Sequence, residues 1–116
     1  MGEIIDLKDV LERVQDDKEL LLELLDIYQE DFVGKRKSLG DAFKDNDIAK
    51  IKSLAHALKG ASGNISAKPI HANCLLIEQM VKNNDLSKAG AVLIELDQQF
   101  AQLQVFAVEL KKKFNA

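Results

Sequence analysis

A histidine near the middle of the chain, His56, stands in a segment whose composition is unusual for a stable helix. Two glycines, Gly60 and Gly63, follow it within an apolar pattern of helical period. Each glycine lowers helix stability by about 0.5–1 kcal/mol relative to alanine. A helix that keeps both therefore has a use for small residues there, and this departure from local propensity marks the segment as the first place to expect chemistry.

A helical wheel predicts that His56 lies on the outer face of this segment. With 100° per residue, the apolar stripe of residues 48–65 centres about 150° away from His56, so the imidazole points to solvent. Its neighbours on the outer face are four residues with small or no side chains, bordered by two lysines: Ala49, Ser53, Gly60 and Gly63, with Lys52 and Lys59. We therefore expect an exposed imidazole that a second protein could approach and contact through these residues.

The chemistry that suits this pattern is phosphoryl transfer. An exposed imidazole is mostly neutral at pH 7, and its free ring nitrogen is a nucleophile. If that nitrogen takes up a phosphoryl group, a nearby lysine can stabilise the added charge. No neighbouring residue is placed to activate water, so the group would be stored and passed on. The alternative is a surface histidine on an alanine-glycine face without a chemical role.

Helices are predicted along the whole chain from apolar residues three and four apart. Asp6 is expected to cap a short first helix, and Asp16 to Glu19 has the spacing of a capping box before a long second helix. Gly34 and Gly40 lie inside that second helix, where it could bend or fray. The apolar stripes predict helices over residues 7–14, 17–43, 48–65, 69–81 and 86–114.

Four helices joined by short turns pack as antiparallel neighbours. We therefore expect an all-α, up-down-up-down antiparallel four-helix bundle, with the short additional N-terminal helix closing one end. The length of 116 residues fits one domain spanning residues 1–116. No run of alternating apolar and polar residues competes with this interpretation.

Composition excludes several other classes of protein. The lone Cys74 rules out an internal disulfide framework and a multi-cysteine zinc site, and it suits a reducing cytosol. No apolar run approaches the roughly 18 residues of a membrane span, and no signal-peptide pattern is present. We therefore expect a cytoplasmic protein without membrane insertion. His71 has no carboxylate three or four residues away, and Cys74 falls on an inward stripe, so neither predicts a metal site.

The charge is unevenly distributed around a net value of −3. Residues 1–31 hold eleven acidic and three basic residues, whereas residues 32–82 hold nine basic and four acidic residues. This central surplus is too small and interrupted to predict nucleic-acid binding. It could favour an acidic protein partner, or it could be a chance imbalance of a solvated surface.

The segment also matches a known family. His56-Ala57-Leu58-Lys59-Gly60, followed by Asn64-Ile65, resembles the signature of histidine-containing phosphotransfer (HPt) domains, four-helix-bundle modules that carry phosphoryl groups between aspartates of response-regulator receiver domains. The resemblance spans essentially the whole chain. It implies that His56 is the phosphoacceptor, that Lys59 stabilises the phosphoryl charge and that Gly60 keeps the face open.

Two further positions follow from the resemblance. Glu78 falls where the family often has a polar residue that orients the histidine; a solvated acid or an ion pair at the edge of the bundle is the alternative. Ser66 stands where the family usually has glycine at the end of the motif helix. Serine is small, so helix packing should survive, but the turn geometry could differ.

The resemblance also implies the partners, namely a response-regulator receiver domain and a hybrid sensor histidine kinase. Magnesium would belong to the acidic pocket of the receiver, and the chain itself would use no cofactor. Without a glycine-rich phosphate loop it would be a phosphoryl carrier, not a kinase, and we expect a monomer. Two alternatives remain: a helical adaptor that binds a receiver without being phosphorylated, and the phosphoacceptor domain of a chemotaxis-type kinase.

Overall fold

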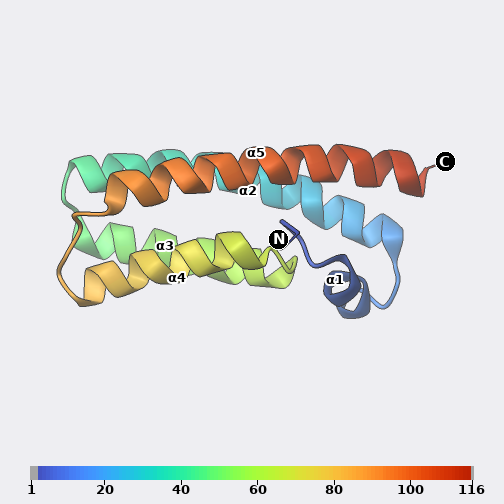
Figure 1. Cartoon of the computed structure of the whole chain (residues 1–116), viewed down its shortest axis with the longest axis horizontal. Coiled ribbons are helices and arrows are strands. Elements are labelled where there is room, and N and C mark those ends of the chain that lie inside the picture. The colour runs from blue at the N-terminus through green and yellow to red at the C-terminus, as the bar shows by residue number, and fades with distance from the viewer. Residues whose placement is uncertain (1–2, 116) are drawn as a thin grey trace.

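The computed structural model describes residues 3–115 and consists, over that range, of helices without strands (Figure 1). This confirms the predicted all-α fold. The helices are α1 (Leu7–Arg13), α2 (Lys18–Lys44), α3 (Ile48–Asn64), α4 (Lys68–Lys82) and α5 (Ala89–Phe114).

Aspartate side chains begin the first three helices. Asp6, Asp17 and Asp47 each accept a hydrogen bond from the backbone N–H three residues later, at 3.1, 3.0 and 3.2 Å. These bonds satisfy N–H groups that have no partner inside the helix. The cap of α2 is Asp17 and not Asp16, because Asp16 has a positive φ of 62° and belongs to the preceding turn.

α2 is one continuous helix, as the prediction over residues 17–43 implies, whereas α5 starts later than predicted. α2 runs through Gly34 and Gly40 without interruption. α5 begins at Ala89 rather than at Leu86, because the Asp85 carboxylate accepts a hydrogen bond from the Ser87 N–H at 3.1 Å. That bond closes a local turn, so the aspartate does not cap a helix starting at residue 86.

The bundle is built from helices of unequal length. α2 and α5 pack side by side and extend past α3 and α4 at one end (Figure 1). α1 lies below this overhang, next to the turn between α3 and α4, and it buries Val10 together with the preceding Ile5. The short helix thus closes one end of the bundle, as predicted.

Side-chain contacts fix how α2 packs on its two neighbours. Phe32 stacks on Phe100 of α5 with ring centroids 4.2 Å apart. Tyr28 shares a buried hydrogen bond of 2.8 Å with Ser62 of α3, and burial raises the pKa of the tyrosine, which keeps its proton. The Tyr28–Ser62 bond therefore links α2 to α3 on the inward side of the helix that carries His56.

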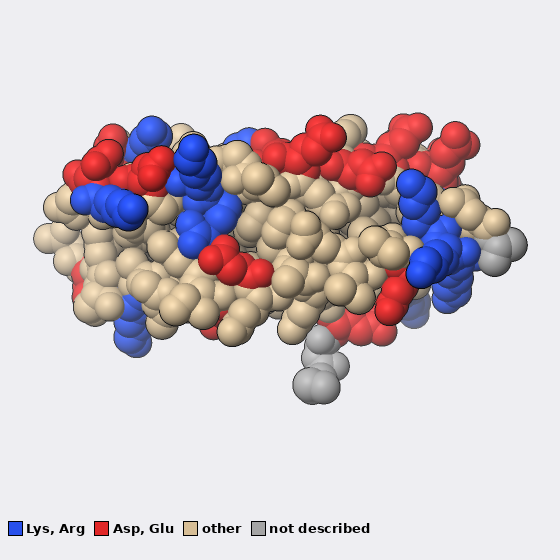
Figure 2. All heavy atoms as spheres, turned by 90° about the horizontal axis from the view of Figure 1, so that it is seen from above, with Lys and Arg blue, Asp and Glu red and all other residues tan. Residues whose placement is uncertain are grey.

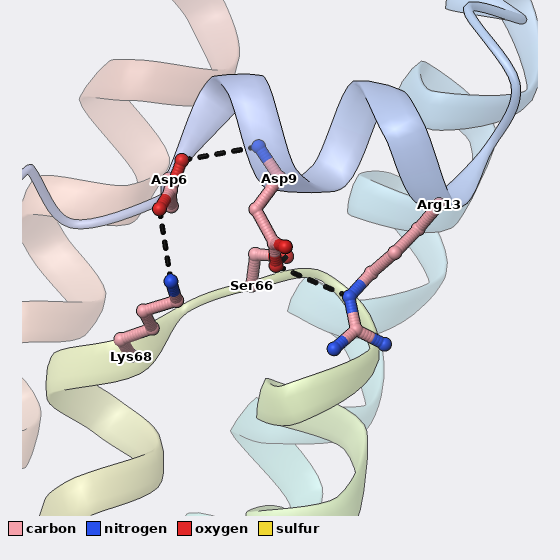
Figure 3. A network of polar contacts seen from close by, with 5 residues as sticks. All are labelled: Asp6, Asp9, Arg13, Ser66 and Lys68. Carbon is pink, nitrogen blue, oxygen red and sulfur yellow. Dashed lines mark hydrogen bonds and ion pairs between the residues drawn. The ribbon is translucent and has the colours of Figure 1, made fainter.

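The turn between α3 and α4 keeps the backbone conformation for which glycine is usually selected. Ser66 has a φ of 56°, in the left-handed region that costs an ordinary residue about 1–2 kcal/mol. It is buried, and its hydroxyl donates to the Asp9 carboxylate at 2.5 Å (Figure 3). The serine therefore gains a contact with α1 that glycine could not make.

Further polar contacts join the same turn to the N-terminal segment. The Asp6 N–H donates to the Ser66 carbonyl at 3.0 Å, and Lys68 donates to the Asp6 carboxylate at 2.9 Å. Arg13 bonds Asp9 at 3.2 Å within α1. We call these five residues, Asp6, Asp9, Arg13, Ser66 and Lys68, the N-terminal clamp (Figure 3).

The face seen from above in Figure 2 has its charged side chains at the two ends and along one edge, around a broad middle region with few of them.

Within residues 3–115, no helix is both long and apolar enough to cross a bilayer. Cys74 is fully buried as predicted, and burial raises the pKa of its thiol to about 12.

Candidate functional site

The imidazole of His56 projects from the middle of α3 into solvent. Its side chain is 72% exposed, whereas Ala55 and Leu58 beside it are completely buried. The helical period alone accounts for this placement, because the buried stripe holds α3 against α2 and α4 and leaves His56 on the outer side. The predicted orientation is confirmed.

A carboxylate from α4 holds one nitrogen of this exposed ring. His56 Nδ1 lies 3.3 Å from Oε2 of Glu78, whose side chain is only 19% exposed. The other oxygen, Oε1, lies 2.7 Å from the Nζ of Lys59 as an ion pair without the alignment of a hydrogen bond. Glu78 thus bridges the histidine and the lysine, and we call these three residues the histidine cluster.

Electrostatics keep Glu78 charged. The Lys59 ammonium holds the pKa of the Glu78 carboxyl below its ordinary value, with a smaller contribution from His56, against the opposing effect of burial. An ionised carboxylate can only accept hydrogen bonds, so the contact requires a proton on Nδ1. In the neutral ring, Nε2 then carries the free electron pair.

The small residues predicted around His56 fall into two groups. Ala49, Ser53 and Gly60 are exposed, and a Cβ built on Gly60 would have no neighbour within 4 Å. Gly63 is half-buried, and a Cβ there would meet His71 of α4 at 3.4 Å. Gly63 therefore belongs to the packing of α3 against α4, which corrects its predicted place on the open face.

The two predicted lysines also differ in their surroundings. Lys52 is exposed one helical turn before His56, as expected for a residue at the border of this face. Lys59 is 23% exposed and paired with Glu78, so its charge is already partly neutralised. Of the predicted site residues, the structure brings His56, Lys59 and Glu78 into direct contact. It leaves Ala49, Lys52, Ser53 and Gly60 around them on the surface.

Sequence reasoning missed the ion pair between Lys59 and Glu78 and the packing of Gly63 on His71. A signal for such contacts is present in the numbering. α3 and α4 form an antiparallel hairpin, in which residues at equal distance from the turn face each other. The pairs His56–Glu78 and Gly63–His71 are both centred on residue 67. A hairpin register would have predicted both.

Metal-binding potential is lacking at this site. Among residues 3–115, no three His, Cys, Asp or Glu side chains are grouped so that they could hold a metal ion. The histidine cluster instead combines a nucleophilic nitrogen, a carboxylate that orients the ring and a nearby ammonium group. Such a set can accept and hold a phosphoryl group supplied from outside.

Comparison with known proteins agrees with this chemistry. The Hpt domain family matches residues 23–106, which is more than half of the chain. No curated protein matches the sequence significantly.

Two solved structures share the fold. The histidine-containing phosphotransfer protein B (HptB) from Pseudomonas aeruginosa PAO1 aligns with a TM-score of 0.88 and 20% identity, over 97% of this chain and 98% of that one. The HPT domain of an Hpt sensor hybrid histidine kinase from Shewanella aligns with a TM-score of 0.73 and 20% identity, over 97% and 94%. The match over residues 23–106, together with this fold, shows that the chain belongs to the Hpt domain family and functions in histidine phosphotransfer within a phosphorelay.

Proposed function

We propose that His56 is the residue that carries the phosphoryl group. It accepts the group from an aspartyl phosphate of a receiver domain and passes it to an aspartate of another response regulator. The observation that supports this assignment is the state of the ring: the side chain is 72% exposed while Nδ1 is held by Glu78. Nε2 is thereby left as the nucleophile facing a partner.

The transfer step follows from this arrangement. The electron pair of Nε2 attacks the phosphorus, the N–P bond forms, and the P–O bond to the aspartate breaks with its electron pair leaving on the carboxylate. The ring then carries a phosphoryl group on Nε2 and a proton on Nδ1, so it becomes positively charged. The Glu78 carboxylate stabilises that charge through the hydrogen bond to Nδ1. Return transfer reverses these bond changes.

Lys59 is proposed to stabilise the phosphoryl oxygens. Its ammonium lies 2.7 Å from Oε1 of Glu78. A lysine side chain has a flexible four-carbon stem, so the ammonium can turn toward a doubly charged phosphoryl group on the neighbouring ring. Glu78 would meanwhile hold Lys59 near the site when no phosphoryl group is bound.

The remaining features of the proposal concern the partners. The exchange needs a receiver domain, and a hybrid sensor histidine kinase would supply phosphoryl groups to the relay. Mg²⁺ would be bound by the receiver, and the chain would act as a cytoplasmic, monomeric phosphoryl carrier without a kinase site of its own.

The decisive experiment offers the protein a phosphorylated receiver domain, without ATP or kinase, and follows uptake on a phosphate-affinity gel. Wild-type protein should be labelled and His56→Gln should not. His71→Gln is the matched control, because His71 is the other histidine of the chain and should be dispensable. Labelling of His56→Gln at the wild-type level would reject the assignment.

The same experiment separates the alternatives. A helical adaptor would bind the receiver without taking up phosphate, and its binding would survive His56→Ala. A phosphoacceptor domain of a chemotaxis-type kinase would be labelled by a kinase with ATP but not by the receiver alone.

A further inference from the structure

A groove of about 510 Å³ lies beside the histidine cluster, between α3 and α4. Its lining combines apolar side chains with lysines and other polar groups: Lys52, Leu75, Glu78, Gln79, Val81 and Lys82. None of these residues except Glu78 has a part in the proposed transfer step.

The groove is continuous with the surface that a phosphotransfer partner must cover. Glu78 forms part of its wall and contacts His56 directly. Lys52 lies one turn before His56 on α3, about 6 Å along the helix axis. A typical stable interface covers about 800 Å² on each partner, which corresponds to a disc of roughly 16 Å radius. A protein that reaches Nε2 therefore covers the groove if its body lies toward α4.

The chemistry of the groove indicates what would fill it. Leu75 is 40% exposed, and Val81 adds further apolar surface. Lys52 and Lys82 are exposed, and neither forms an ion pair within residues 3–115. The carboxylate of Glu78 is already neutralised by Lys59. The groove thus has an apolar floor and a positive rim.

We propose that the protein exchanging phosphoryl groups with His56 docks on this groove, with an apolar side chain against Leu75 and carboxylates near Lys52 and Lys82. This inference rests on the proposed function and adds the orientation of the partner to it. Ser53 and Gly60 are exposed on the outer face of α3 beside His56, and their small side chains or lack of one allow a partner to approach the imidazole. All lining residues except Lys52 belong to α4, so a partner that fills the groove has its body over α4.

The first test places a charge on the floor of the groove. Leu75→Glu should lower the rate of transfer from a phosphorylated receiver, at concentrations below saturation, by about tenfold or more. Leu76→Glu is a matched control, because Leu76 is 36% exposed on the same helix but lines a separate pocket with Asp85 and Lys88. It should stay within about twofold of wild type. Labelling by the small phosphodonor phosphoramidate, which needs no docking, should be equal in all three proteins.

The second test reverses charge at the rim. Lys82→Glu should slow transfer and weaken its dependence on salt, because a rim charge acts mainly on association. Lys88→Glu removes an exposed lysine at the other pocket and should change neither quantity.

Several outcomes would overturn the inference. Equal rates for Leu75→Glu and wild type would show that the groove is not covered. A loss of transfer in Ile27→Glu alone would place the partner over α2, where Ile27 is 63% exposed. If wild-type protein takes phosphate from phosphoramidate but from no receiver, the proposed function itself is wrong. Failure of the groove inference gives a different result, in which wild type takes phosphate from the receiver and Leu75→Glu does so at the same rate.

Discussion

The histidine cluster and the N-terminal clamp use the same kinds of side chain for different ends. In the clamp, the carboxylate of Asp6 is bound by Lys68 and that of Asp9 by the hydroxyl of the buried Ser66. The backbone carbonyl of the same serine accepts a hydrogen bond from the Asp6 N–H. In the histidine cluster, the carboxylate of Glu78 also has two partners, but one of them is a ring whose second nitrogen faces solvent. Both networks restrict side-chain motion, and only the histidine cluster leaves a nucleophile free.

The two networks differ in reactivity because only the histidine cluster contains a nucleophilic atom, His56 Nε2, that no neighbouring group binds. Asp6 and Asp9 hold α1 on the α3–α4 turn, so removing their bonds should affect stability and not transfer. Glu78 holds a ring that the fold does not need, so removing its bonds should affect transfer and not stability. The following changes test that division.

The largest effect is expected from Glu78→Ala. A hydrogen bond to a charged group contributes about 1.5–3 kcal/mol, and the distance of 3.3 Å places this bond at the weak end. Loss of about 1.4 kcal/mol corresponds to a tenfold slower step. We therefore expect about tenfold slower phosphotransfer with little change in the denaturation midpoint. Glu78→Gln can still accept a hydrogen bond from Nδ1, so its transfer rate should lie between the rates of wild type and Glu78→Ala. An unchanged rate in Glu78→Ala would contradict the orienting role of Glu78.

Substitution of Ser66 should act on the clamp alone. Ser66→Ala keeps the left-handed backbone, with its cost of about 1–2 kcal/mol, and loses the bond to Asp9. Ser66→Gly loses the same bond but removes the strain. Urea denaturation should therefore show Ser66→Ala as the less stable variant, by about 1 kcal/mol relative to Ser66→Gly, with transfer unchanged in both. Equal stability would mean that the positive φ costs nothing here.

The two glycines of α3 should separate by a smaller amount. Gly60→Ala adds a Cβ into open space and should stabilise the protein by about 0.5–1 kcal/mol through helix propensity. Gly63→Ala gains less, since its Cβ must fit against His71 at 3.4 Å. Thermal unfolding of both variants measures the difference.

On the open face, Gly60→Leu should slow transfer while the helix remains intact, whereas a normal rate would show that partners do not approach over Gly60.

The smallest effect is expected from pH. The Lys68 contact lowers the pKa of Asp6, and the Ser66 hydroxyl lowers that of Asp9, each from an ordinary value of 3.8. Because the folded pKa values are the lower ones, these carboxylates stabilise the fold above pH 3.8, and the contribution is lost as pH falls through the folded values. The protection of α1 amides against hydrogen exchange, taken relative to the intrinsic exchange rate at each pH, should therefore fall in acid. Asp6→Asn should make this dependence shallower; an identical profile would exclude Asp6 as a contributor.

Features that depend on residues close together in the chain could be predicted from the sequence better than features that depend on contacts between helices. The cap at Asp6, the outward direction of His56 and the burial of Cys74 are set within one or two helical turns, and all could be predicted. The start of α5 was misplaced because a side chain–backbone bond at Asp85 competes with helix capping. Gly63 was misassigned because a wheel does not show which neighbouring helix a residue meets.

The amino-acid sequence by itself determined the helices, the apolar face of each and the exposure of one imidazole, because these properties follow from the 3.6-residue period of a single helix. Only the tertiary structure decided that Glu78 holds the ring and Lys59 together, that Gly63 packs on His71, and that Ser66 is bonded to α1. These contacts join different helices, some from residues far apart in the chain. They exist only once the packing of the bundle has set the register between its helices.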